Sequence, residues 1–318
     1  MQIFRCPACS SPVYFHNLAC GCGQEVSFDP DTQSMIAGAA HCANRDDIAC
    51  NWVAEQGGLC RSCAMTETVP DLRAEQNLPL WEESESAKRR MLAELSRWGW
   101  FTPVDSGARP VFRMLSEETL HGGADVIMGH ADGIITINVT EASDAVLAHR
   151  QAQFGELYRT MLGHMRHEMA HFLFLRLAED PAFLDDFRAL FGDERADYGA
   201  ALQRHYDAPM EPGAQYITTY ATAHPHEDWA ETLAHLQHLV SMLDSGVASG
   251  LRLPESPADG YDPYLEADTE VLITRAVHLS IAVNHVNRAL DLPDLYPFVL
   301  TQPVREKMAL AHRWLRRL

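Results

Sequence analysis

The chain has 318 residues, a hydrophobic content of 47% and a formal net charge of −19. This length and hydrophobic content suffice for one large globular domain and a small one. The negative charge would repel nucleic acids and anionic membranes, so neither is expected as a partner. No stretch approaches the roughly 18 consecutive apolar residues of a membrane helix, and the start of the chain does not resemble a signal peptide.

Eight cysteines lie near the start of the chain in closely spaced pairs. They are Cys6, Cys9, Cys20, Cys22, Cys42, Cys50, Cys60 and Cys63. Paired spacing without a signal peptide indicates metal binding in a reducing compartment and not disulfides, so we expect a cytoplasmic protein. Eight thiolates suit two tetrahedral zinc sites of four cysteines each.

The simplest grouping of the cysteines follows the sequence, with the first four on one zinc ion and the last four on the other. The alternative is a crossed grouping, in which the two Cys-x-x-Cys pairs share one ion as in rubredoxin-like knuckles. We expect residues 1–70 to form this zinc-ribbon domain, and so small a unit depends on its metal for folding. Its three basic and seven acidic side chains lack the positive footprint of a nucleic-acid ribbon, which favours a scaffold role or a protein partner.

A linker is expected at Val69–Pro79, and residues 71–318 are expected to form the second domain. A helix is predicted from about Glu82 to Trp98. Strands are predicted at Val111–Leu115, Ala124–Met128 and Ile134–Val139. His130 and Asp132 lie in the glycine-bounded turn between the last two strands. They could approach a functional site, but a role in the turn itself is the favoured interpretation.

The segment His167-Glu-Met-Ala-His171 is an H-E-x-x-H pattern in a predicted helix that no proline interrupts until Pro181. Residues i and i+4 lie on one face of a helix, so His167 and His171 can bring two imidazole nitrogens to one zinc ion. Glu168 projects beside them, where it can take a proton from a metal-bound water. The alternative is an ordinary helix with two surface histidines. His164, which lies three residues before His167, is a conceivable further ligand.

A second constellation runs from Tyr220 to Glu231. Pro225 suits the first position of a helix, and acidic residues follow in the first turn. Glu227 and Glu231 are four residues apart and therefore share a face of that helix. Two carboxylates at this spacing are a common metal arrangement, in which one ligates and the other accepts a hydrogen bond from a ligating histidine. A solvated acidic helix start is the alternative, which the presence of H-E-x-x-H in the same chain disfavours.

Several longer motifs carry a family resemblance over almost the whole chain. They are Cys42-Ala-Asn, Cys50-Asn-Trp, Leu59-Cys60-Arg-Ser-Cys63, Pro70-Asp-Leu, Gly129-His-Ala-Asp-Gly-Ile-Ile-Thr-Ile-Asn138, His167-Glu-Met-Ala-His171, Phe187-Arg-Ala-Leu-Phe-Gly-Asp-Glu194 and Glu227-Asp-Trp-Ala-Glu231. The chain resembles the zinc-binding metallopeptidases that have an N-terminal zinc-ribbon domain. We accordingly expect an α+β fold, in which a mainly helical zincin-like metallopeptidase domain with a small mixed sheet follows the small ribbon domain.

The catalytic end also resembles the gluzincins and, in one short stretch, anthrax lethal factor. In that protein a tyrosine lies seven residues ahead of a Glu-x-x-x-Glu pair, as Tyr220 lies ahead of Glu227 here. The resemblance implies Glu227 as the third zinc ligand, Glu231 as a residue that supports the ligands, and Tyr220 as a hydrogen-bond donor to the transition state. Asp228 departs from the pattern, because it adjoins the ligand and could compete for the metal.

The expected function is hydrolysis of a peptide or protein substrate by a zinc-activated water, with Glu168 as the general base. One catalytic and two structural zinc ions are expected. The resemblance to gluzincin architecture suggests that the strand Ile134–Val139 binds the substrate backbone along its edge. The alternative is a non-catalytic zinc module that serves as an interaction scaffold. Glu168 argues against it, because a structural site gains nothing from a carboxylate at that position.

Overall fold

The computed structural model describes residues 2–55, 57–143, 146–147, 160–253 and 260–316. The chain forms two compact units, Ile3–Arg176 and Leu177–Arg317, with Gln2 belonging to the second. The fold is mixed α/β, with small sheets and a cysteine-rich N-terminal segment, as predicted. In the described ranges, no helix has both the length and the apolar character that crossing a bilayer requires.

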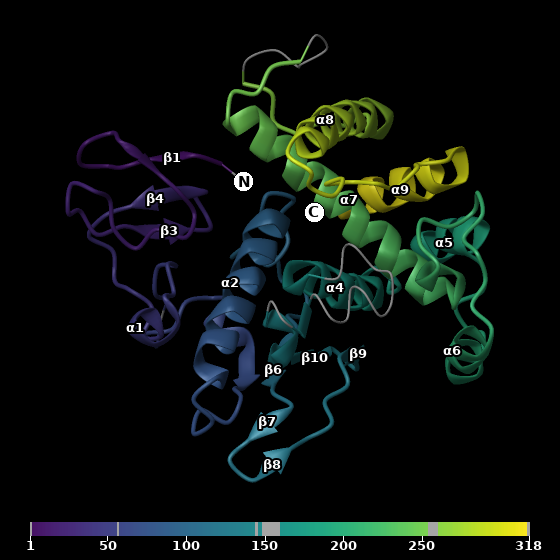
Figure 1. Ribbon diagram of the computed structural model, residues 1–318, viewed down its shortest axis with the longest axis horizontal. Helices are drawn as coiled ribbons and strands as arrows, with labels where there is room; N and C mark the ends of the chain where they lie inside the picture. The colour runs from purple at the N-terminus through teal and green to yellow at the C-terminus, as the bar shows by residue number, and fades with distance from the viewer. Residues whose placement is uncertain (1, 56, 144–145, 148–159, 254–259, 317–318) are drawn as a thin grey trace. The chain divides into compact units, whose positions relative to one another are not determined.

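The N-terminal part of the first unit consists of short hairpins and a short helix (Figure 1). Its elements are β1 (Phe4–Arg5), β2 (Pro12–Val13), β3 (Ser27–Asp29), β4 (Ser34–Ile36), the helix α1 (Arg45–Ile48) and a 3₁₀ turn at Cys63–Met65. β1 pairs with β2 and β3 with β4, both antiparallel. The rings of Phe15 and Trp52 pack against Phe28 at centroid distances of 4.9 and 5.8 Å. A hydrophobic core this small cannot stabilise the segment alone, so bound metal must contribute much of the folding energy.

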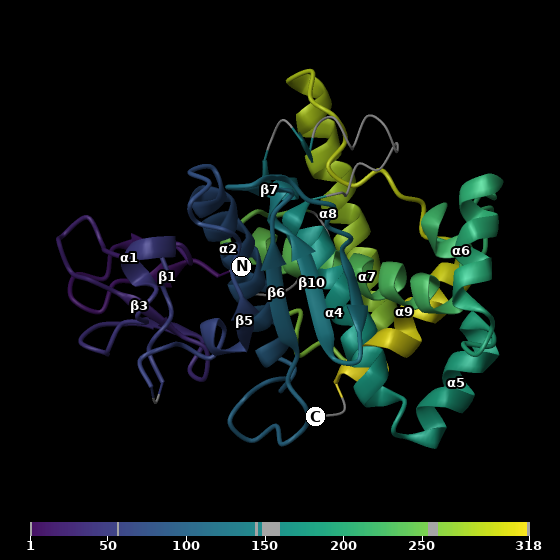
Figure 2. The same cartoon turned by 90° about the horizontal axis from the view of Figure 1, so that it is seen from below.

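A four-stranded sheet in the order β5-β6-β10-β9 forms the middle of the first unit (Figure 2). Its strands are β5 (Thr66–Thr68), β6 (Val111–Leu115), β9 (Gly129–Ala131) and β10 (Ile134–Asn138), and a separate hairpin is formed by β7 (Glu118–Thr119) and β8 (Gly122–Gly123). β6 runs parallel to both β5 and β10, whereas β9 runs antiparallel to β10. β5 lies within residues 1–70, so the segment predicted as the ribbon supplies one strand of this sheet.

Two predictions about this sheet are wrong. The predicted strand at Ala124–Met128 is irregular, and β9 begins only at Gly129. Asp132 and Gly133, at φ angles of 51° and 82°, form a two-residue hairpin turn, so strand pairing starts directly beside it. β10 lies between β6 and β9, so β9 and not Ile134–Val139 is the edge strand at this side of the sheet.

Two helices, α2 (Asn77–Ser96) and α4 (Met161–Leu177), cover one face of the sheet (Figure 2). Fully buried apolar residues alternate along the two central strands and form this face; they are Phe112, Met114, Ile135 and Ile137. Lys88 of α2 lies over the Phe112 ring at 4.9 Å. Phe172 of α4 packs edge-on against His130 of β9, with a centroid distance of 6.0 Å. The sheet therefore fixes the position of α4, which carries the H-E-x-x-H pattern.

A buried ion pair joins these two helices. Arg166 Nη2 of α4 lies 2.6 Å from Glu94 Oε2 of α2, and the two side chains are only 2% and 6% exposed. Arg166 directly precedes His167, so the pair anchors α4 next to the predicted metal ligand.

We expect Glu94→Gln to lower the free energy of unfolding by about 3–5 kcal/mol, because it removes a charged partner of the buried Arg166 guanidinium. Urea denaturation would measure this loss. The matched control is Glu67→Gln, whose pair with Arg113 is 52% and 42% exposed, and for which we expect a loss of about 0–1 kcal/mol. Equal losses in the two variants would contradict the anchoring role of the buried pair.

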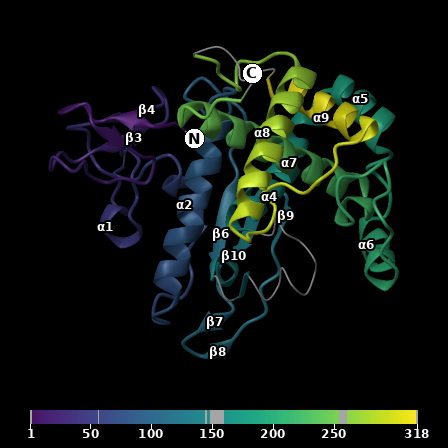
Figure 3. The ribbon, with the colours of Figure 1, turned by 45° about the horizontal axis from the view of Figure 1, so that its top comes forward.

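In the second unit, α7 (Pro225–Ala248) is the central helix and contacts α5, α8 and α9 (Figure 3). The surrounding elements are α5 (Pro181–Phe191), α6 (Tyr198–Asp207), α8 (Thr269–Ala289), α9 (Gln302–Leu315) and a 3₁₀ turn at Tyr220–Thr222. Phe183 of α5 packs edge-on against both Trp229 of α7 and Trp314 of α9, at 5.2 Å in each case. As predicted, Pro225 opens α7, and the His224 side chain accepts a hydrogen bond from His226 N.

Candidate metal centre

The eight cysteines form two clusters, and their grouping follows the sequence. The first cluster contains Cys6, Cys9, Cys20 and Cys22, and the second contains Cys42, Cys50, Cys60 and Cys63. Neighbouring sulfurs lie 3.6 or 3.8 Å apart in both clusters. Zinc–sulfur bonds of about 2.3 Å at tetrahedral angles place sulfurs about 3.8 Å apart, whereas disulfide sulfurs are separated by about 2.05 Å. The clusters have the dimensions of zinc tetrathiolate sites, and the crossed grouping is wrong.

The second cluster is more enclosed than the first, because all four of its cysteines are buried. The backbone N–H groups of Cys60 and Cys63 donate hydrogen bonds to Cys42 Sγ and Cys60 Sγ at 3.3 and 3.4 Å. Neighbouring cysteines lower the pKa of Cys42 and raise the pKa of Cys60. Thiols crowded in this way cannot all ionise without a cation. The donors therefore fit a zinc ion that has no position open to water.

α4 brings together the two histidines of the H-E-x-x-H pattern. His167 Nε2 and His171 Nε2 lie 3.2 Å apart, and both residues are partly buried. Two nitrogens on a tetrahedral zinc ion, with bonds of about 2.0–2.1 Å, are separated by about 3.3–3.4 Å. The two ring nitrogens are thus spaced as two ligands of one ion.

Glu168 follows the first of these histidines and is 7% exposed. Its Oε2 is buried and has no hydrogen-bond partner in the part of the chain that the structure describes. A buried carboxylate oxygen without a donor is costly, so its presence calls for a functional explanation. It fits the predicted role of Glu168, because a general base needs a free oxygen to receive a proton from water.

In the second unit, Glu227 lies in the first turn of α7 and is 1% exposed. Tyr198 Oη of α6 donates a hydrogen bond to Glu227 Oε1 at 2.6 Å. Tyr220 lies in the 3₁₀ turn that precedes α7. Burial raises the pKa of Tyr220, and the negative charge of Glu227 raises it further. The Tyr220 phenol therefore stays protonated at neutral pH and can donate a hydrogen bond.

The two other acidic residues of this stretch have partners of their own. Asp228 Oδ2 accepts a hydrogen bond from Lys307 Nζ of α9 at 2.6 Å, and both side chains are buried. Burial raises the pKa of Asp228 to about 6, although the Lys307 charge opposes this shift. Glu231 Oε2 accepts a hydrogen bond from Thr218 Oγ1 at 2.8 Å. Asp228, the predicted competitor for the metal, is therefore already engaged by a cation.

Residues 77–314 match the sequence model of a family described as "Putative zinc-binding metallo-peptidase", and residues 3–74 match a zinc-ribbon domain. The chain belongs to this metallopeptidase family. Three uncharacterized proteins, one from Mycobacterium bovis and two from strains of Mycobacterium tuberculosis, are each 36% identical to it over 329 aligned residues. Each alignment covers 98% of this chain and 94% of the relative. No solved structure matches the chain.

Two further histidines lie close to the H-E-x-x-H helix in sequence or in space. His164 Nε2 lies 2.9 Å from Glu141 Oε2, so the conceivable further ligand has a carboxylate partner instead. His130 stacks on His171, with ring centroids 6.4 Å apart and an interplanar angle of 10°. It also has the predicted role in the turn, because Gly133 N donates to His130 Nε2 at 3.2 Å. His130 thus combines the two roles that the sequence left as alternatives.

Tyr198 is the residue of the candidate site that sequence reasoning missed. It follows Asp197, which caps α6, and it belongs to none of the motifs found in the sequence. His130 is also part of this site. Burial lowers the pKa of His130 to about 4, so its side chain is uncharged at neutral pH. The hydrogen bond from Tyr198 to Glu227 could not be read from residue type, because it depends on which residues the fold brings together. The stacking of His130 on His171 depends on the fold in the same way.

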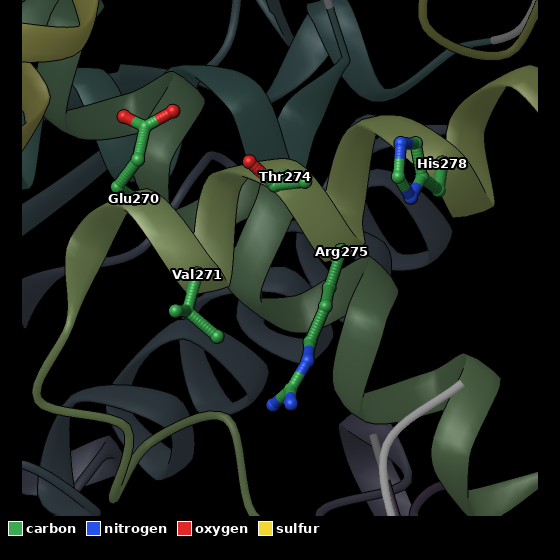
Figure 4. Close-up of a pocket in the computed structure, with 5 residues that line it drawn as sticks. All are labelled: Glu270, Val271, Thr274, Arg275 and His278. Atoms are coloured by element: carbon green, nitrogen blue, oxygen red, sulfur yellow. The ribbon is translucent and has the colours of Figure 1, made fainter. Parts of the chain in front are cut away.

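The chain also has a surface hollow along α8, lined by Glu270, Val271, Thr274, Arg275 and His278 (Figure 4). Its charged groups are paired with neighbours: Glu270 with Arg305, and Arg275 with Glu266 at 3.4 Å. Arg275 also lies over the Tyr261 ring at 4.4 Å. Because these charges are already compensated, we assign the hollow no part in the chemistry.

Proposed function

We propose that this chain is a zinc-dependent peptidase that hydrolyses peptide bonds with Glu168 as its general base. The observation that carries the proposal is the pair of histidine nitrogens 3.2 Å apart on α4, with the buried and unpartnered Glu168 Oε2 on the same helix. Membership of the zinc-binding metallopeptidase family supports it. A non-catalytic zinc module would have no use for a base beside the ligands.

We assign the catalytic zinc ion to His167, His171 and Glu227, with a fourth position open to water. The resemblance to the gluzincins implies Glu227 as the third zinc ligand. Its hydrogen bond from Tyr198 supports the assignment, because ligating carboxylates are usually held by such partners. Asp228 is the poorer candidate because Lys307 already binds it. Glu231 is assigned a supporting role behind the ligands.

Zinc bound there would supply a Lewis acid that lowers the pKa of a water molecule and polarises the substrate carbonyl. Glu168 takes the proton of the attacking water and passes it to the leaving amine. Tyr220 donates its O–H to the carbonyl oxygen as negative charge develops on that oxygen. Burial raises the pKa of Tyr220, which favours the protonated phenol that this hydrogen bond requires.

The substrate is proposed to be a peptide or a protein. β9 is an edge strand of the sheet, and its His130 stacks on His171 of α4, so the outer backbone groups of β9 can pair with an extended substrate. The two four-cysteine zinc sites are proposed to be structural, and the ribbon to serve stability or a protein partner.

We expect three zinc ions per chain when the protein is purified without added zinc and analysed for metal. His171→Ala should lower this number to two, because the cysteine sites do not depend on that residue. A wild-type ratio near one would show that the cysteines do not bind metal as proposed. Peptide hydrolysis that requires both the histidine-bound ion and Glu168 is the functional test.

A further inference from the structure

The second cysteine cluster lies beside a buried arginine of α2. Arg89 is 2% exposed, and its Nη2 donates a hydrogen bond to the Ile48 carbonyl at 3.4 Å. Ile48 ends α1 and lies two residues before Cys50, which is fully buried. The guanidinium is therefore anchored next to the segment that carries one of the four sulfurs.

Among the described residues, no carboxylate forms an ion pair with Arg89. Its Nε and Nη1 are buried and have no hydrogen-bond partner within the ranges that the structure describes. The two other fully buried charges of α2, Glu85 and Lys88, lie 2.8 Å apart and compensate each other. A buried arginine is expected only where an anion balances it.

The zinc-loaded second cluster would carry an excess of negative charge. One Zn²⁺ and four thiolates carry a net charge of −2, and all four cysteines of this cluster are buried. Two backbone N–H groups, of Cys60 and Cys63, donate hydrogen bonds to its sulfurs, but they carry no full charge. A buried anion of this kind is stabilised by a cation nearby, and such outer partners commonly tune metal affinity.

We propose that Arg89 of α2 is the counter-charge of the zinc tetrathiolate formed by Cys42, Cys50, Cys60 and Cys63. The anchoring of the guanidinium at the Ile48 carbonyl, two residues before Cys50, supports this assignment. The inference concerns the structural site and does not depend on the proposed peptidase activity.

This assignment makes α2 a part of the ribbon's second zinc site. Other contacts tie the ribbon to the same helix, including Ser86 Oγ with His16 Nδ1 at 3.2 Å and Gln33 Nε2 with Ser96 Oγ at 2.9 Å. Zinc bound by the last four cysteines would thus stabilise the attachment of the ribbon to α2. A protein cut at residue 70 would lose this zinc site, and with it the proposed counter-charge of Arg89.

The test compares Arg89→Met, which removes the charge but keeps much of the apolar stem, with Arg89→Lys, which keeps the charge. Arg90→Met is the matched control, because it removes a charge from the next residue of α2, whose partner is Glu94 at 3.4 Å. Full-length, zinc-loaded protein is incubated with a chelator and a thiol-alkylating reagent. Mass spectrometry of the digested protein then gives the alkylation rate of each cysteine, so the first cluster serves as an internal control.

We expect Arg89→Met to speed alkylation of the second cluster by about 10–100-fold and to leave the first cluster at the wild-type rate. Arg89→Lys and Arg90→Met should stay within about threefold of wild type, since both keep a positive charge at position 89. An unchanged second cluster in Arg89→Met, or equal loss of protection in both clusters, would overturn the proposal. If Arg89→Met does not fold, Arg89→Lys decides: wild-type protection supports the charge, and lost protection refutes it. Rapid alkylation of the wild-type second cluster without chelator would instead refute zinc binding there.

Discussion

Replacing Glu168 by glutamine should abolish most peptide hydrolysis, lowering kcat by roughly 10²–10⁴-fold or more, while the zinc content stays at the wild-type value. Glutamine has nearly the same shape as glutamate but cannot accept the proton of the attacking water. Its neighbours His167 and His171 keep their positions on α4, so binding of the ion is not affected. Steady-state hydrolysis and metal analysis of the same preparation measure both quantities.

Glu179→Gln is the matched control for this change, because Glu179 is an exposed glutamate just beyond the end of α4. It should leave hydrolysis unchanged. Full activity in Glu168→Gln would refute the general base and favour a non-catalytic zinc module. Loss of zinc together with activity would show that Glu168 supports the metal site and not proton transfer.

Removing the Tyr220 hydroxyl should lower kcat with little change in KM. Its O–H is proposed to bond the oxygen only when negative charge develops, so Tyr220→Phe affects the transition state and not substrate binding. One such donor contributes about 2.7–4 kcal/mol in comparable sites, which corresponds to roughly 10²–10³-fold in kcat. Zinc content and folding should stay at the wild-type level.

Tyr198→Phe removes the same atom from the other tyrosine and should act differently. Tyr198 holds Glu227 Oε1 at 2.6 Å, so its loss should weaken zinc affinity by about 10–100-fold. Zinc titration of the metal-free protein would measure this change. If Tyr220→Phe lost zinc and Tyr198→Phe lost only kcat, the roles assigned to the two tyrosines would have to be exchanged.

Local spacing made much of the candidate site predictable. The four-residue separation of His167 and His171 places both rings on one helix face in any α-helix, and the structure shows their nitrogens 3.2 Å apart. The cysteines group in sequence order because short connections bring neighbouring sulfurs to one point more easily than distant ones. The proline at position 225 opens α7 because its ring already has the backbone angle of a first helical residue.

Contacts between residues far apart in the sequence could not be predicted in this way. Lys307 is 79 residues from Asp228, and nothing in the local sequence shows that it binds this carboxylate. Asp228 therefore remained a competing ligand until the fold was known. The same reason applies to Tyr198 with Glu227 and to Arg89 with Ile48.

The error at Ala124–Met128 has a different cause. Apolar residues there favour a strand, but the turn at Asp132 and Gly133 has a conformation that starts pairing immediately beside it. The three residues before that turn form β9, and the apolar residues that precede β9 form no strand. Turn geometry, which composition alone does not specify, decided where the edge strand lies.

A cleavage profile of a complex peptide mixture tests the central claim most directly. The mixture is incubated with the wild-type protein, with protein treated with a chelator, with the same protein after zinc is restored, and with Glu168→Gln. Sequencing of new peptide termini should show cleavage by the wild type, its loss on chelation, its return with zinc and its absence in Glu168→Gln. New termini that form equally with Glu168→Gln, or none with the zinc-loaded wild type, would contradict the assignment of this chain as a zinc peptidase.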